Sequence, residues 1–300
     1  MAVSESSQKT LKKASTVILA RQNNGELQIY LLKRSSRSVF MPGMYVFPGG
    51  NVSLEDHNPA LLEAHSPVNP ETVCRLTGNE LAFEIIFPFA IAAIRETFEE
   101  AGVLISSSNE GNDGYPAEIR HKRISHQLEK EWLQDLIISR GLILHLVKLS
   151  RWSHWITPEL MPRRYDTRFF VAALPDGQEC TPDNRETTHG IWITPKEGLS
   201  GNLNREIPLS PPTLVTLHEL LQFQTLNDLE RQIESRQWGN PLVPRLIPSP
   251  DGGIIIEPWD PMRYQEIEID FKNMENKILP VGEPFSRIWN CKGVWLPVEI

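Results

Sequence analysis

The hydrophobic pattern of this 300-residue chain begins with two β-rich runs, residues 16–21 and 27–34. They flank Asn23-Asn24-Gly25, a sequence typical of the tight turn of a β-hairpin. Later β-rich runs cover residues 103–105, 144–155, 167–173 and 190–193. The pattern therefore predicts a sheet that opens with a hairpin and gains further strands from distant parts of the chain.

Helical spacing appears between these strands. The apolar residues that cluster on one side at about 100° per residue are Phe87, Ile91, Ile94, Phe98 and Ala101. Pro88 suits a first helical turn, so we expect this helix to begin at Phe87-Pro88, and Gly102 is well placed to end it.

Other segments complete the outline. A second helix is predicted over residues 119–140, where an apolar stripe of Ile124, Leu128, Trp132 and Leu136 is assigned to the core. An amphipathic helix is expected over residues 213–236, a polar loop over 106–118, and short β-like runs at 253–256 and 293–296. The predicted class is α/β (α+β), with a mixed β-sheet sandwiched between helices.

The polar side of the helix expected to begin at Phe87 carries three carboxylates, Glu96, Glu99 and Glu100, within an arc of about 100°. Glu96 and Glu100 form a like-charge i,i+4 pair, and the last helical turn disfavours anions. A hard divalent cation would reverse both penalties, since Mg²⁺ binds carboxylate oxygens and substrate phosphates. The alternative is a solvated acidic face with Arg95 paired to Glu99.

A glycine-rich turn upstream, FPGG at residues 47–50, decides between these alternatives. Paired glycines let backbone approach a ligand closely. Followed by the acidic Asp56 and later by RETFEEAGV at residues 95–103, this turn resembles the signature of the Nudix hydrolases, which cleave a nucleoside diphosphate linked to another group. The usual signature has seven residues between its first acidic position and its arginine. Here residues 57–94 number 38, so an insertion splits the box.

One branch of the Nudix family, the coenzyme A diphosphatases of the peroxisomal type and their bacterial relatives, carries an insertion at this point. The stretches similar to that branch are FMPGMYVFPGG at residues 40–50, WITPE at 155–159 and RRYDTRFF at 163–170, within a likeness that covers roughly residues 14–197.

The resemblance implies a domain organisation. A Nudix fold is expected over residues 10–200, with the insertion at about residues 57–87 holding a short helix or two. Residues 201–300 form a C-terminal extension expected to pack on the Nudix core. This extension either helps to wall the substrate cleft, supports a homodimer or has a purely structural role.

The resemblance also implies roles for individual residues. Glu96, Glu99 and Glu100 would coordinate Mg²⁺ or Mn²⁺ or activate the attacking water, with the Gly49 carbonyl as a further ligand. Arg95 would orient the carboxylates without acting as a catalyst.

The family often adds a later acidic residue or histidine as a base or ligand. Glu186 and His189 are the candidates here, with ordinary loop polarity as the alternative. Asp56 fills the first acidic position of the signature, where a structural role is expected.

Substrate choice depends on LLKRS at residues 31–35, whose spacing to Gly43 and FPGG looks like the motif of coenzyme A-cleaving Nudix enzymes. Val39 stands where that motif has a second arginine, and Leu32 where it has threonine. Arg34 is in register, and Arg37 lies near enough to substitute, with a solvated strand end as the alternative. The further groups assigned to the substrate are Gly49, Gly50 and Arg168. Arg163 and Arg164 are also candidates to contact the anionic substrate, and pairing of these arginines with the nearby Asp166 is the alternative.

Composition and charge limit the partners. The formal net charge of −8 argues against a broad nucleic-acid surface, which needs clustered cations. Three well-separated cysteines indicate neither a disulfide framework nor a zinc site, and favour a reducing compartment. The polar N-terminus, the absence of a long apolar run and the C-terminal sequence PVEI lead us to expect a cytoplasmic protein without membrane insertion or a peroxisomal signal.

The resemblance implies metal-dependent hydrolysis of coenzyme A or acyl-coenzyme A to 3′,5′-ADP and (acyl-)4′-phosphopantetheine. One alternative keeps the chemistry and changes the substrate to ADP-ribose, a dinucleotide or a nucleotide sugar. Another is a Nudix-fold binding module without turnover, against which the intact acidic cluster argues.

Overall fold

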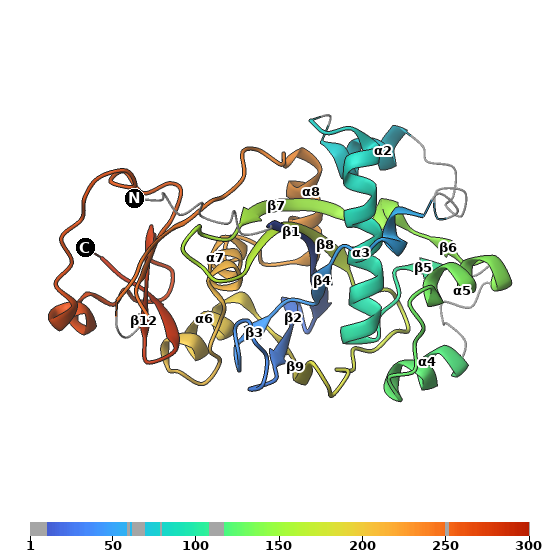
Figure 1. Ribbon diagram of the computed structural model, residues 1–300, viewed down its shortest axis with the longest axis horizontal. Coiled ribbons are helices and arrows are strands. Elements are labelled where there is room, and N and C mark those ends of the chain that lie inside the picture. Colours follow the sequence, from blue (N-terminus) through green and yellow to red (C-terminus); the bar gives the residue numbers. More distant parts are fainter. Residues whose placement is uncertain are drawn as a thin grey trace, which may run out of the picture.

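A seven-stranded mixed sheet forms the centre of the computed structural model, which describes residues 11–58, 61, 70–78, 80–107, 117–249 and 252–299 (Figure 1). Five strands follow the order β3-β2-β1-β8-β7, while β4 pairs with β1 and β9 with β2. The strands are β1 (Leu11–Asn23), β2 (Glu26–Arg34), β3 (Tyr45–Val46), β4 (Gly49–Asn51), β7 (Ser150–Ile156), β8 (Arg164–Ala173) and β9 (Thr187–Ile193). The parallel β1–β8 pair among antiparallel neighbours confirms the predicted mixed sheet.

The predicted hairpin is also confirmed. β1 and β2 pair antiparallel up to Asn23 and Glu26, with Asn24 and Gly25 between them at φ values of 50° and 84°. Positive φ at both central residues is the geometry that an Asn-Gly turn supplies.

Both faces of the central strands are buried. Val17 and Leu19 belong to a core with helix α3 (Phe83–Ala101), whereas Ile18 and Ala20 contact a second core on the opposite face. That second core includes helices α6 (Pro195–Leu203), α7 (Pro211–Leu220) and α8 (Leu226–Ser235). In Figure 1, α3 stands on one side of β1 and β8, and α6 and α7 lie on the other. The sheet is therefore sandwiched between helices, as expected.

Helix α3 begins earlier than predicted, at Phe83 instead of Phe87. The rings of Phe83 and Phe87 contact at 5.5 Å between centroids, an i,i+4 pair that stabilises one more turn before Pro88. Gly102 ends the helix as predicted, with a left-handed φ of 74° and its N–H donated to the Phe98 carbonyl at 2.8 Å.

Two predicted helices are each divided. The segment 119–140 forms α4 (Ala117–Ile124) and α5 (Trp132–Arg140), separated at His126, whose φ of 56° no right-handed helix allows. The segment 213–236 forms most of α7 and α8. Thr225 and Asp228 build a capping box that starts a new helix between them.

Two predicted strands also differ. Residues 103–105 are buried core without strand pairing, and the strand β5 (Ser106–Ser107) follows them. The run 144–155 is interrupted by the 3₁₀ turn η2 (Leu146–Lys148), which separates β6 (Ile143–Leu144) from β7. The rest of the predicted loop 108–116 lies outside the described residues.

The described part of the insertion holds η1 (Glu55–His57) and one helix, α2 (Pro70–Thr77), in agreement with the expectation of a short helix or two. The insertion lies over the end of α3 at which that helix begins (Figure 1).

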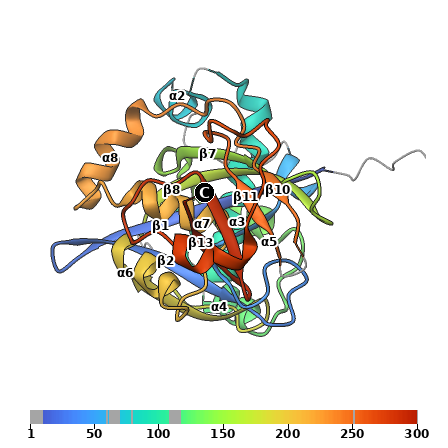
Figure 2. The same ribbon diagram turned by 90° about the vertical axis from the view of Figure 1, so that its left-hand side faces the viewer.

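The last third of the chain adds a four-stranded antiparallel sheet in the order β10-β11-β12-β13. Its elements are β10 (Arg245–Ile247), β11 (Ile254–Ile256), η3 (Phe271–Lys277), β12 (Arg287–Cys291) and β13 (Val294–Pro297). Ile255, Ile288 and Trp295 on one face join the core that contains α6 and α7. This sheet lies at the opposite end of the molecule from α4 and α5 (Figures 1 and 2). Among the helices described, none is long and apolar enough to span a bilayer.

Candidate active site

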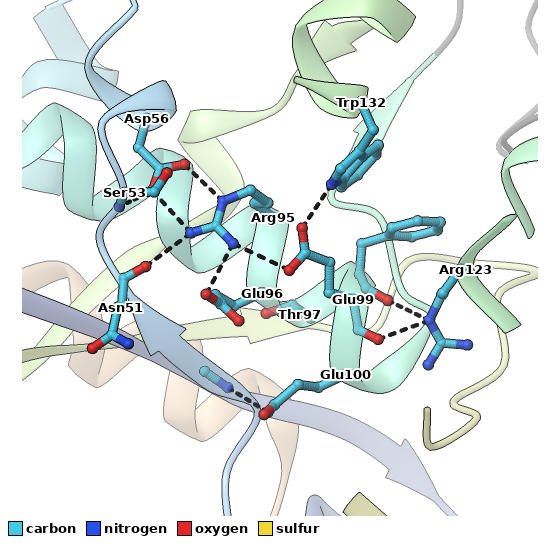
Figure 3. Close-up of polar contacts among 12 residues, drawn as sticks. Asn51, Ser53, Asp56, Arg95, Glu96, Thr97, Glu99, Glu100, Arg123 and Trp132 are labelled. Atoms are coloured by element: carbon cyan, nitrogen blue, oxygen red, sulfur yellow. Dashed lines mark hydrogen bonds and ion pairs between the residues drawn. The ribbon is translucent and has the colours of Figure 1, made fainter. Parts of the chain in front are cut away.

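The two parts of the split signature meet around Arg95, which is 8% exposed. Its Nε and Nη2 donate to Asp56 Oδ1 and Oδ2 at 2.8 and 2.9 Å, and Nη2 also donates to the Asn51 carbonyl at 2.8 Å (Figure 3). Its Nη1 donates to Glu96 Oε1 at 2.9 Å and Glu99 Oε2 at 3.2 Å. The insertion therefore leaves the signature contiguous in space.

Asp56 is itself held in place. Its buried carboxylate accepts hydrogen bonds from the Ser53 N–H at 2.7 Å and the Ser53 hydroxyl at 3.0 Å. Asp56 thus has the structural role that the sequence suggested, and Arg95 orients two carboxylates of α3 as proposed.

The three glutamates of α3 lie in a desolvated environment. Burial raises the pKa of Glu96 to about 7, with Arg95 opposing and Glu99 reinforcing the shift. Burial likewise raises the pKa of Glu99, and raises that of Glu100 well above its usual range. Three acidic groups with raised pKa values on one surface fit a functional site better than a solvated acidic face.

The glycine-rich turn holds these carboxylates at close range. The Gly49 N–H donates to Glu100 Oε2 at 2.9 Å, which tethers the turn to the last turn of α3. A Cβ added to Gly50 would lie 2.4 Å from Glu96 Cδ, so that only glycine fits without displacing the carboxylate. The turn and the helix therefore form one unit.

The donor chemistry of this unit fits a hard divalent cation, because its ligands would all be oxygens. A cation would also relieve the crowding of buried acidic groups. Across the described ranges, no three His, Cys, Asp or Glu side chains are grouped as metal ligands. Glu96 and Glu99 point toward Arg95, and Glu100 points toward Gly49 (Figure 3), so side-chain rotation would be needed to bring them to one ion.

Glu186 lies at the same place, on the loop before β9, and its exposed side chain borders the α3 carboxylates. Asp183 shapes this loop by accepting hydrogen bonds from the N–H groups of Arg185, Glu186 and Thr187 at 3.2, 3.1 and 2.9 Å. His189 is exposed on β9 opposite Lys33, away from the carboxylates. The structure thus favours Glu186 over His189 as the additional acidic group.

The predicted arginines are placed differently from one another. Arg34 lines the cleft, with its Nε donated to the Phe40 carbonyl at 3.0 Å, and its charge acts to lower the pKa of Glu100. Arg37 is exposed in the turn after β2 and is not among the residues that line the cleft.

Arg168, which is expected from the sequence to contact the substrate, is not among the residues that line the cleft. Its guanidinium lies 5.9 Å from the Phe89 ring centroid and 5.0 Å from that of Trp238, on the α3 side of the sheet. Thr167 and Phe169 face the cleft, so Arg168 must face the other way because successive strand residues alternate. The two other arginines considered, Arg163 and Arg164, are also absent from the cleft lining.

Two residues that support the carboxylates were not predicted. The Trp132 indole N–H donates to Glu99 Oε1 at 2.7 Å, so this residue does more than fill the core stripe. Arg123 donates from Nε to the Phe98 and Glu99 carbonyls at 2.6 and 3.1 Å, capping the end of α3. Both come from the helices that follow α3, and no pattern in the sequence indicates these contacts.

The site opens into a cleft with a cavity volume of about 370 Å³. β1, β4, β7 and β8 line it together with the α3 glutamates, and Pro211, Ile255 and Trp295 border it from the last third of the chain. A second hollow of about 400 Å³ adjoins the other side of the glutamates, and charged groups such as Lys130 and Arg185 dominate its lining.

A mixed sheet between helices, with a glycine-rich turn against a helix that carries the buried Glu100 and the partly buried Glu96 and Glu99, defines a Nudix hydrolase. Residues 11–220 match the family model described as the NUDT19 Nudix domain, and the chain belongs to this family.

Named relatives support the assignment. The acyl-coenzyme A diphosphatase NUDT19 of Gallus gallus is 30% identical over 315 residues, covering 88% of this chain and 82% of that protein. Its Xenopus laevis counterpart is 28% identical over 250 residues, covering 72% of this chain, which thereby spans 65% of that protein's length. A crystal structure of a Nudix hydrolase from Alicyclobacillus acidocaldarius superposes with a TM-score of 0.64 at 23% identity, covering 78% of this chain and all of the other, and supports the fold.

Proposed function

We propose that this protein hydrolyses the diphosphate of coenzyme A or acyl-coenzyme A to 3′,5′-ADP and (acyl-)4′-phosphopantetheine. The observation that carries the proposal is the intact assembly of Asp56, Arg95 and the α3 glutamates at a cleft. The acyl-coenzyme A diphosphatases named among the relatives share the family and up to 30% sequence identity, which supports the substrate class.

The reaction adds water across one phosphorus–oxygen bond. The water oxygen bonds to a phosphorus, the bridging P–O bond breaks, and the departing phosphate takes the electron pair. A bound divalent cation would neutralise the phosphate oxygens and lower the pKa of a coordinated water. Glu96, Glu99, Glu100 and the Gly49 carbonyl would hold this cation, and oxygen donors favour Mg²⁺ or Mn²⁺.

Three side chains of the protein have proposed roles in proton transfer, substrate binding and positioning. Glu186 is the proposed proton acceptor, because it is exposed beside the carboxylates and has room to face a water molecule. Arg34 would attract the substrate phosphates from the floor of the cleft. Arg95 stays bound to Asp56 and keeps Glu96 and Glu99 in position.

The coenzyme A motif is incomplete in this chain. Val39, which stands where the motif has its second arginine, is 73% exposed, and Arg37, the proposed substitute, lies outside the cleft lining. Of the two arginines expected from the motif, Arg34 lines the cleft and the second has no counterpart in that lining. This observation keeps the second candidate open, a Nudix hydrolase that acts on ADP-ribose, a dinucleotide or a nucleotide sugar.

The test is product analysis with Glu100→Gln. Glutamine keeps the shape of the side chain and removes its charge, so release of 3′,5′-ADP from coenzyme A should fall by about two or more orders of magnitude while the fold is retained. Glu118→Gln, in a largely exposed surface pair with Lys122, is the matched control and should leave the rate unchanged. Equal rates for Glu100→Gln and the wild type would refute the role of the carboxylate cluster.

A further inference from the structure

The cleft changes chemical character along its length. Near α3 its lining is charged, with Arg34, Glu100 and Glu186. The lining that comes from the last third of the chain is mainly apolar, with Pro211, Pro212, Pro244, Ile255 and Trp295. Its two polar members, Ser210 and Thr213, share a hydrogen bond between their hydroxyls at 2.8 Å. In Figure 1, α3 and the C-terminal sheet lie well apart, so the α3 glutamates and the residues of that sheet reach the cleft from different parts of the molecule.

The apolar end is poorly suited to phosphate. A helix N-terminus usually offers free N–H groups to an anion. α7 instead begins with Pro211 and Pro212 at its first two positions, and proline has no N–H to donate. The first two positions of this helix therefore present proline rings to the cleft, where a phosphate site would usually present N–H donors.

Hydrogen bonds hold the elements at this end of the cleft in place. The buried Asn202 side chain of α6 donates to the Trp295 carbonyl at 2.8 Å and accepts from the Leu209 N–H at 2.9 Å. Tyr45 of β3 donates its N–H to the Pro208 carbonyl at 2.7 Å. These bonds tie the C-terminal sheet, the loop before α7 and the Nudix sheet together, so the apolar wall is preformed.

We infer that the C-terminal sheet closes this end of the cleft as a pocket for the uncharged arm of the substrate, the pantetheine chain and the acyl group attached to it. The inference rests on the proposed function. Coenzyme A thioesters are charged at the nucleotide half and uncharged along the other arm, which matches the two ends of the cleft. A volume of about 370 Å³ is within the range of small-molecule sites.

The inference assigns catalysis and acyl-chain selection to different parts of the chain. The family match ends at residue 220, whereas Pro244, Ile255 and Trp295 lie beyond it. The Nudix part thus performs hydrolysis, and the residues beyond 220 determine which acyl chains are accepted.

The experiment compares kcat/KM for free, octanoyl- and dodecanoyl-coenzyme A in Trp295→Leu and in a matched control, Trp289→Leu. Trp289 lies on the same sheet but packs in the separate core on its outer face. Trp295→Leu should lower the dodecanoyl-to-free ratio about tenfold, since apolar contacts of this size discriminate by that order. Trp289→Leu should leave the ratio unchanged.

A second variant guards against a folding defect in Trp295→Leu. Pro212 is partly exposed in the first turn of α7, where an acidic residue is compatible with the helix dipole. Pro212→Asp places a charge at the apolar end and should lower the same ratio. An unchanged ratio in folded, active Trp295→Leu and Pro212→Asp would overturn the inference and leave the proposed function intact. Failure of the wild type to release 3′,5′-ADP from any of these substrates would overturn both.

Discussion

Replacing Asp56 with alanine tests whether the two parts of the split signature depend on each other. The substitution removes a bidentate ion pair at 2.8 and 2.9 Å in which both side chains are nearly inaccessible, at 9% exposed for Arg95 and 2% for Asp56. Although burial alone would lower the pKa of Arg95, the hydrogen bonds with Asp56 and the nearby carboxylates raise it overall. The guanidinium thus stays charged and needs its partners.

Removing one partner of a buried ion pair destabilises a protein by about 3–5 kcal/mol. We expect about 3 kcal/mol, because Arg95 retains Glu96, Glu99 and the Asn51 carbonyl as partners. For a chain of 300 residues, that loss corresponds to a fall in Tm of about 5 °C. Without Asp56, Arg95 is also expected to draw Glu96 and Glu99 out of position, so kcat should fall as well.

The assay is a thermal melt together with the initial rate on coenzyme A. The matched control is Glu118→Ala, which removes a surface pair with Lys122 at 3.4 Å whose side chains are 67% and 39% exposed. Such a pair contributes about 0.5 kcal/mol or less, so the control should barely move Tm. A Tm for Asp56→Ala within about 1 °C of the wild type, which is the shift expected for a surface pair, would refute the reasoning.

Three further predictions follow the same reasoning: two concern residues around the site, and the third concerns a buried glutamate away from it. Gly50→Ala places a Cβ 2.4 Å from Glu96 Cδ. Its kcat should therefore fall about tenfold or more while circular dichroism stays unchanged, and full activity would contradict the close packing. Trp132→Phe keeps a ring near Phe98 but loses the 2.7 Å bond to Glu99, so the metal concentration needed for half-maximal activity should rise about tenfold. An unchanged metal dependence would show that the bond has no such role. Glu257 has no described hydrogen-bond partner for its carboxylate, and burial raises its pKa to about 8 from 4.5. Between these pH values the folded state holds a proton that the unfolded state has lost, so the free energy of unfolding should fall as pH rises through this window. The α3 glutamates, whose pKa values are also raised, add to this fall in both proteins. Glu257→Gln should therefore make the fall smaller without removing it, as measured by urea unfolding at pH 5 and pH 9, and parallel pH profiles for both proteins would contradict the assignment.

Local signals in the sequence predicted the elements that depend on local interactions. The turn at Asn24 and Gly25 and the end of α3 at Gly102 need only the backbone freedom of those residues, and both were predicted correctly. The start of α3 was misplaced because Pro88 dominated the pattern, although the Phe83–Phe87 contact carries the helix one turn further back.

The breaks in the long predicted helices had weaker signals. Thr225 and Asp228 are a recognisable capping box, so the division between α7 and α8 could have been predicted. The left-handed turn at His126 contains no glycine that would have indicated it in the sequence. Backbone hydrogen bonds from the His126 and Gln127 N–H groups to the Arg123 and Lys122 carbonyls close it.

The site was predictable where resemblance and spacing coincide. The α3 glutamates, Gly49 and Glu186 border the same cleft, and their roles toward a metal ion stay predictions. The contacts of Arg123 and Trp132 depend on how later helices pack on α3, which periodicity does not specify. Arg168 could have been excluded by strand alternation, since both of its neighbours face the cleft.

The most direct test of the central claim is a competition experiment on the pure protein with Mg²⁺ or Mn²⁺. Coenzyme A, octanoyl-coenzyme A, ADP-ribose, NADH and a diadenosine polyphosphate would be supplied together, and the products resolved by mass. The account predicts 3′,5′-ADP and the matching 4′-phosphopantetheine as the dominant products. Dominant release of AMP from ADP-ribose or a dinucleotide would contradict the substrate assignment, and no turnover of any substrate would contradict the enzyme assignment itself.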